Sequence, residues 1–129
     1  MVTTAPLTPD QLRSELADFT GSETWHRHPL NCNVTLTDGA LFFAEQAGAH
    51  WLMDVFATEL PRFVAKHGFA SIHVHVANRK AEIVADDGNS NVFWRKKIDF
   101  TDCPEGTWDF YMAPGGPGDT TVILLTSEY

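Results

Sequence analysis

The sequence predicts an α+β domain in which N-terminal helices pack on one face of a C-terminal antiparallel sheet of about five strands. Two observations predict this class. Apolar residues recur at helical spacing in the first half of the chain, and at every second position from residue 71 onward. The chain has 129 residues, of which 43% are hydrophobic, enough for a core without disulfides or metal. We therefore expect residues 1–129 to form a single domain.

The first predicted helix spans about residues 9–19 and follows a flexible tail at residues 1–7. Thr8 can cap this helix, Pro9 suits its first position, and Gln11 stands where a capping box requires Glu or Gln. These signals mark the start of the helix more sharply than its end.

Two further helices are expected at about residues 39–47 and 49–67, where aromatic and aliphatic residues repeat at every fourth position. Gly48 divides the two helices. Pro61 either kinks the second helix or begins a final turn, and Gly68 follows its end. Two adjacent apolar rows predict that this region is deeply buried.

From residue 71 the spacing becomes that of strands, with turn residues between the segments. Short connections favour antiparallel neighbours, because a parallel pair needs a long crossover. We therefore expect an antiparallel meander with strands at residues 71–78, 81–85, 92–100, 107–113 and 121–126.

The formal net charge of −8 and the pI of about 5.0 disfavour direct binding to nucleic acid or to an anionic membrane. Both halves of the chain, divided after residue 70, carry −4, so the charge favours solubility. Another protein is the expected partner, and the oligomeric state stays open. Four acidic residues follow one another without an intervening base and form a candidate acidic surface: Asp99, Asp102, Glu105 and Asp109.

No signal peptide and no apolar run of about 20 residues is present, so we expect a cytoplasmic protein without a membrane span. The two cysteines, Cys32 and Cys103, are far apart and are expected to be free thiols in a reducing compartment. No motif calls for a cofactor, and none is expected.

Residues 22–38 follow neither period cleanly, and we expect a loop there with a short extended piece at 33–36. Loops without regular structure often display binding groups, so this loop is the first place to look for a site. An internal lock between the loop and the helices is the alternative interpretation, in which Arg27 pairs with an acidic residue. The candidate binding residues are Trp25, Arg27, His28, Asp38, Trp51 and Asp54.

Histidines and a cysteine suggest a second, catalytic hypothesis. His26, His28, His73 and His75 could form a four-ligand metal site if the loop lies over the strand that carries the second pair. Cys32 near the first pair could act as a thiolate nucleophile. No known zinc spacing matches, and exposed or hydrogen-bonded histidines explain the pattern equally well.

A set of segments spread over most of the chain forms a recognisable pattern: Phe19–Glu23, Trp25, Arg27, His28, Thr37–Gly39, Ala44–Asp54, Asp86–Asn89, Val92 and Ser127–Tyr129. In these residues the chain resembles an uncharacterised family of small bacterial and phage proteins that are often carried on plasmids and other mobile elements. The resemblance names no activity. It implies a protein that acts by binding a host protein, for example as an inhibitor of a nucleic-acid-binding defence complex.

Three hypotheses follow from the sequence. The leading one is a non-catalytic protein-binding module. The second is a metal- or thiol-dependent enzyme that uses His26, His28 and Cys32 with His73 and His75. The third is a homo-oligomeric structural protein joined through its strand-rich half.

Overall fold

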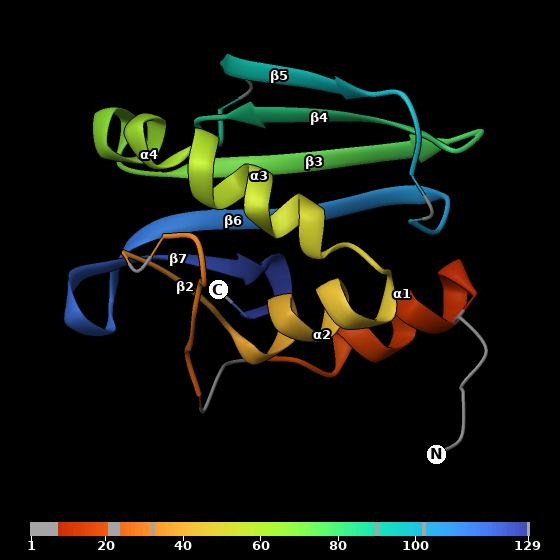
Figure 1. Cartoon of the computed structure of the whole chain (residues 1–129), viewed down its shortest axis with the longest axis horizontal. Coiled ribbons are helices and arrows are strands. Elements are labelled where there is room, and N and C mark those ends of the chain that lie inside the picture. The colour runs from red at the N-terminus through yellow and green to blue at the C-terminus, as the bar shows by residue number, and fades with distance from the viewer. Residues whose placement is uncertain (1–7, 21–23, 32, 90, 102, 129) are drawn as a thin grey trace.

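A computed structural model describes residues 8–20, 24–31, 33–89, 91–101 and 103–128 of the chain (Figure 1). The predicted tail at residues 1–7 lies outside the described residues. The helices are α1 (Pro9–Ala17), α2 (Asp38–Gln46), α3 (His50–Glu59) and α4 (Pro61–His67), with 3-10 turns η1 (Pro117–Asp119) and η2 (Thr126–Glu128). The strands are β1 (His26–Arg27), β2 (Val34–Leu36), β3 (Ala70–Ala77), β4 (Lys80–Asp86), β5 (Val92–Ile98), β6 (Gly106–Gly116) and β7 (Thr120–Leu125).

The capping signals of α1 are confirmed. The Thr8 hydroxyl accepts the Gln11 N–H at 3.2 Å, and the Gln11 side chain accepts the Thr8 N–H at 3.0 Å. This reciprocal capping box satisfies two of the backbone donors that a helix start leaves unpaired. The helix ends at Ala17, two residues before the predicted end.

The predicted helix at 49–67 is two helices. Gly48, with φ of 62°, separates α2 from α3 as expected, because glycine adopts this left-handed conformation without strain. Pro61 begins α4 directly after Leu60, since proline lacks the N–H that a continuing helix would need. Gly68, with φ of 78°, ends α4 in the predicted left-handed cap.

The sheet is mixed and, within the described residues, has seven strands in the order β1-β2-β7-β6-β3-β4-β5. The prediction of five antiparallel strands is therefore corrected by β1 and β2. β2 falls within the short extended piece expected at 33–36, whereas β1 lies in the part of the segment expected to be a loop. β2 pairs in parallel with β7, while the other neighbours are antiparallel. All three β2 residues are buried, and three residues are too few for a strand period to be recognised in the sequence.

The predicted meander is also wrong, because β6 pairs with β3 and not with β5. The spatial order β6-β3-β4-β5 is that of a Greek key, and the connection from β5 to β6 passes the turn between β3 and β4, where Thr101 donates to the Arg79 carbonyl at 2.8 Å. The run Arg95-Lys96-Lys97 of β5 fits an edge position, because bases on an edge strand discourage pairing with a further strand.

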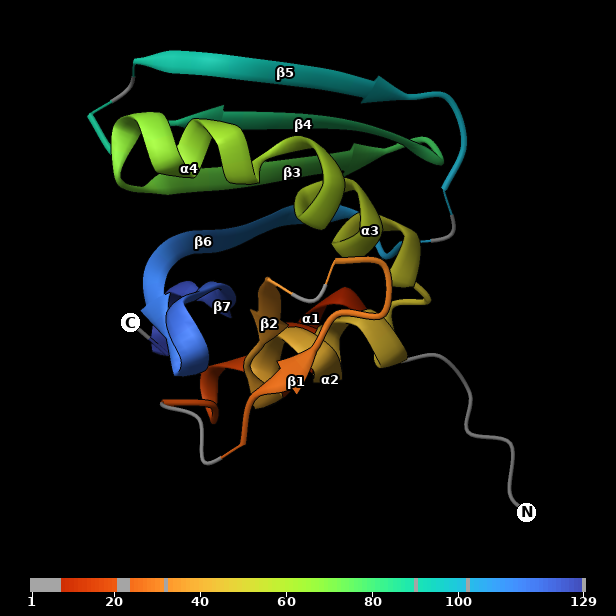
Figure 2. The ribbon, with the colours of Figure 1, turned by 60° about the vertical axis from the view of Figure 1, so that its left-hand side comes forward.

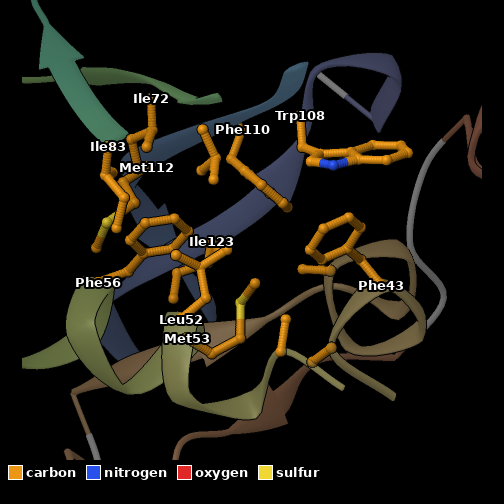
Figure 3. Packing of buried hydrophobic residues seen from close by; sticks show 14 of the residues in the cluster. Phe43, Leu52, Met53, Phe56, Ile72, Ile83, Trp108, Phe110, Met112 and Ile123 are labelled. Carbon is orange, nitrogen blue, oxygen red and sulfur yellow. The ribbon is translucent and has the colours of Figure 1, made fainter. Parts of the chain in front are cut away.

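Phe110 of β6 lies at the centre of the core (Figure 3). Its ring packs edge-on against Phe43 of α2 at 5.0 Å and against Phe56 of α3 at 5.5 Å. Trp108, on the same face of β6, packs against Phe43 at 5.5 Å and donates its indole N–H to the Pro104 carbonyl. The deep burial predicted for the aromatic helix rows is thus explained by contact with alternate residues of the central strand.

Helices α2, α3 and α4 cover one face of the sheet, and α1 departs from the predicted single layer (Figures 1 and 2). α1 packs beside α2 and reaches the start of β6, where the Arg13 guanidinium lies 4.8 Å from the Trp108 ring centroid and donates to the Thr107 carbonyl. The opposite face of β3, β4 and β5 is open to solvent, as the exposed His75, Arg95 and Lys97 show. No helix among the described residues has the length and apolar character needed to cross a membrane.

Candidate functional site

The loop before β2 is pinned to α3 through His28. The His28 side chain is only 2% exposed, and its Nε2 lies 2.9 Å from Oδ1 of Asp54. The Leu30 N–H donates to Nδ1 of His28 at 3.0 Å. Because Nδ1 accepts this bond, the proton of the ring resides on Nε2 and is donated to Asp54. His28 therefore joins the loop to the helix with a defined tautomer.

A second and a third contact fasten the same loop. His26 Nε2 lies 2.8 Å from Oδ1 of Asp38 at the start of α2, and the Asn31 amide donates to the Ala57 carbonyl at 3.0 Å. Trp25 remains 43% exposed, and Trp51 packs against the core.

Of the six predicted binding residues, His28 contacts Asp54, and Asp38 contacts His26. Arg27 is an exposed residue of β1. The two contacts tie residues 26–28 to α2 and α3, as the lock between the loop and the helices predicts.

A buried carboxylate, that of Glu128, joins the C-terminal segment to Thr37 and Gly39 at the start of α2. Glu128 is 9% exposed and reaches the N-terminus of α2. It accepts the Thr37 hydroxyl at 2.5 Å, the Gly39 N–H at 3.1 Å and the Leu125 N–H at 3.0 Å. A negative charge is favourable at a helix N-terminus, where backbone N–H groups are unpaired. Sequence reasoning missed this site, because the partners lie about 90 residues apart.

On the open face of the sheet, His73 lies between two carboxylates. Its Nδ1 is 2.8 Å from Asp109 Oδ1, and its Nε2 is 3.2 Å from Asp86 Oδ2. A neutral imidazole carries one N–H, so both contacts are hydrogen bonds only when the ring is protonated.

The Ser71 hydroxyl lies 3.4 Å from the same Nε2. The contacts thus run from Ser71 to His73 and from His73 to Asp109, as they do from serine to histidine to aspartate in the catalytic triad of a hydrolase. Ser71 is only 7% exposed, and Asp86 competes for the nitrogen that would take the serine proton. The geometry favours a structural cluster of polar side chains that joins β3, β4 and β6.

The four histidines predicted as metal ligands all have other partners. His26, His28 and His73 contact aspartates, and His75 Nδ1 lies 3.1 Å from the Thr107 hydroxyl. In the part of the chain that the structure describes, no three His, Cys, Asp or Glu side chains are grouped to hold a metal ion. The structure therefore does not bring the two histidine pairs together as one ligand set. Cys32 lies outside the described residues.

Cys103 is a buried thiol in the connection before β6. Burial raises the pKa of Cys103 from 9.0 to about 12, because the thiolate loses its solvation. We expect native protein at pH 8 to react with iodoacetamide at Cys103 at least about tenfold more slowly than unfolded protein, since the thiolate is the nucleophile. Peptide mapping by mass spectrometry separates this thiol from Cys32.

The same shift has a consequence for stability at high pH. Because the folded pKa lies above the unfolded one, the neutral thiol favours folding below pH 9, and this contribution falls between pH 9 and about pH 12. A Cys103→Ala variant should therefore lose less of its unfolding free energy over this range than the parent. Equal labelling rates in native and unfolded protein would contradict the burial of this thiol.

The candidate acidic surface is only partly described. Asp99 and Glu105 are exposed, while Asp109 is paired with His73 and Asp102 lies outside the described residues. Asp109 lines a hollow of about 210 Å³ between α1 and β6, and Asp99 lines another of about 480 Å³ beside β4 and β5. The described residues thus place Asp99 and Asp109 in different surroundings.

The turn between β4 and β5 accounts for a further part of the sequence pattern. Asp86 accepts the Gly88 N–H at 2.8 Å, and Asp87 accepts the Asn89 N–H at 2.8 Å and the Asn91 side-chain amide at 2.9 Å. Hydrogen bonds lower the pKa of Asp87. The bond from the Asn91 side chain has the largest effect, and the bond from the Asn89 backbone has the next largest. These residues are therefore explained by the geometry of the turn.

Charge is distributed unevenly along the sheet, although the two halves of the sequence carry the same net charge. Residues 62–98, which include most of α4 and all of β3, β4 and β5, carry seven of the nine Lys and Arg residues and three of the seventeen Asp and Glu residues. Their net charge is +4, and that of the rest of the chain is −12. These elements lie together at one end of the molecule (Figure 2). The charge that is even between the two sequence halves is therefore uneven between the two ends of the folded chain.

Together these features define an α+β protein with a mixed Greek-key sheet, a loop locked to its helices, and a basic end on an otherwise acidic molecule. A family model described as a family of unknown function, DUF6876, matches residues 10–129, and the chain belongs to that family. No curated protein and no solved structure matches the chain.

Proposed function

We propose that this chain is a non-catalytic protein-binding module that engages its partner through charged surface. The observation that carries the proposal is the division of charge between a basic end of +4 and a remainder of −12. Such a division gives a protein an orientation-dependent attraction for a charged partner.

The side chains considered for catalysis support the same proposal. His26, His28 and His73 are held by aspartates, and Cys103 is a buried thiol with a raised pKa. The alternative of a metal- or thiol-dependent enzyme that uses Cys32 with these histidines and His75 is less supported, because the histidines already have partners within the chain.

A finer proposal concerns the biological context. The resemblance to proteins of phages and mobile elements suggests a host protein as partner, and inhibition of a nucleic-acid-binding defence protein would suit an acidic surface. This context rests on the resemblance alone.

Affinity capture from a lysate of the source organism tests the proposal. The tagged chain should retain a stoichiometric partner at low salt and release it as salt rises, because screening weakens charge attraction. Reversal of Asp99 and Glu105 to Lys should weaken capture about tenfold if the acidic surface is used.

The matched control is reversal of Glu15 and Asp18 to Lys, which changes the net charge equally on exposed positions of α1 and its end. If capture weakened equally in both variants, the effect would be due to overall net charge and not to the positions of Asp99 and Glu105. Absence of any stoichiometric partner for the parent chain would overturn the proposal.

A further inference from the structure

Strand β5 forms one edge of the sheet and is paired with β4 alone in the described residues. It is seven residues long, whereas the strand at the other edge, β1, has two. An edge strand presents a row of unpaired backbone N–H and C=O groups, which is a template for an additional strand. β5 is therefore the longer of the two edges that could accept one, and Figure 2 shows both edge strands.

β5 is held firmly by the elements beside it. Phe93 stacks on His67 at 4.4 Å and on Phe63 at 5.2 Å, both in α4. Lys96 Nζ lies 3.2 Å from Glu59 Oε2 of α3. A strand that is ordered before binding loses less conformational entropy on binding, so this edge is suited to take up a flexible segment.

The charge of β5 indicates which kind of added segment this edge would attract. Its residues include Arg95, Lys96 and Lys97 and no acidic residue. Arg95 and Lys97 are exposed. They share the open face of the sheet, because their register partners in β4, Val84 and Glu82, lie on that face. Acidic side chains at alternate positions of an added strand would stand beside these two bases, and opposite charges on neighbouring strands attract.

A hollow of about 480 Å³ lies beside this row. Its lining includes His75, Lys80 and Lys97, with Glu82 and Asp99 at the same place.

We propose that the β5 edge is the docking site for an extended acidic polypeptide segment, which adds to the sheet as a further strand. This inference deepens the proposed binding function and rests on it. A second copy of the chain is a poorer occupant, because antiparallel pairing of β5 with itself about Lys96 would place Arg95 opposite Lys97. A nucleic acid is disfavoured because the rest of the chain, at −12, repels a long polyanion.

Lysine and arginine on an edge strand also prevent uncontrolled strand pairing. The two roles are compatible. The charges that repel another copy of β5 attract an acidic segment, so the edge is closed to one partner and open to the other.

The test uses the full chain and a labelled ten-residue peptide in which Glu alternates with Val or Thr. Fluorescence anisotropy should show binding, and a peptide with Lys in place of Glu should bind at least about tenfold more weakly. The Arg95→Glu/Lys97→Glu variant should lose binding to the Glu peptide by about the same factor. The control variant Arg62→Glu/Lys66→Glu reverses two bases of α4 and should change binding less than threefold.

Backbone pairing has its own readout. Binding should slow hydrogen exchange at alternate amides of Val92–Ile98, and N-methylation of alternate peptide amides should abolish both protection and binding. Binding without new protection would overturn strand addition, since charge alone would explain it. Light scattering that shows a dimer through β5 before peptide is added would overturn it in favour of a second copy.

The failure of this inference and that of the proposed function are distinguishable. If the Glu peptide does not bind, but the chain still captures a partner that depends on Asp99 and Glu105, the docking edge is wrong and the protein-binding function stands.

Discussion

Replacing Glu128 by alanine is expected to destabilise the protein by about 3 kcal/mol or more. The carboxylate accepts the Gly39 and Leu125 N–H groups and the Thr37 hydroxyl in a buried position. Each buried donor that loses its acceptor costs about 1–3 kcal/mol, and the N-terminus of α2 also loses a favourable charge. Urea unfolding followed by tryptophan fluorescence measures the free energy of unfolding.

Two variants separate this effect from a general loss of charge. Glu128→Gln retains one acceptor oxygen and should cost less than Glu128→Ala. Glu45→Ala removes an exposed carboxylate of α2 and should change stability by less than about 0.5 kcal/mol. If Glu128→Ala were as stable as Glu45→Ala, the role of this carboxylate as an internal helix cap would be wrong.

The Gly39→Ala substitution is expected to destabilise the protein by about 2 kcal/mol, although alanine normally favours a helix over glycine by about 1 kcal/mol. A β-carbon at residue 39 would lie 2.6 Å from Leu125 Cδ1 and 2.6 Å from Glu128 Oε1. Such overpacking costs about 1–3 kcal/mol and would displace the carboxylate from its donors.

A double-mutant cycle tests the cause of this reversal. Because alanine at position 128 removes one of the two clashes, Gly39→Ala/Glu128→Ala should be less destabilised than the sum of the single variants. Chemical denaturation of all four proteins gives the coupling energy. Strict additivity would show that Gly39 is not needed for the approach of Glu128.

The regular elements could be predicted from local sequence because their signals are local. Thr8 and Gln11 mark the start of α1, and Gly48 and Gly68 take the left-handed conformations that end helices. The alternation from residue 71 predicted the five longer strands. Strand β2 has three residues, all buried, and too short a span for any period to show.

The candidate site could be predicted only as a neighbourhood. The sequence singled out residues 22–38, and the structure shows His28 bound to Asp54 and His26 bound to Asp38. The Glu128 cap and the cluster around His73 were not predicted, because their partners are brought together by strand pairing between distant segments.

By itself, the sequence determined the α+β class, the placing of helical segments before the five longer strands, and the acidic balance, since propensity, periodicity and charge are properties of neighbouring residues. Only the tertiary structure decided that β6 lies beside β3, that β2 runs parallel to β7, and that the basic residues gather at one end. The physical reason is that burial selects the pairing. At its central position between β3 and β7, the apolar face of β6 is covered by Phe43 of α2 and Phe56 of α3. The bases of β5 lie at an edge, where they discourage pairing with a further strand.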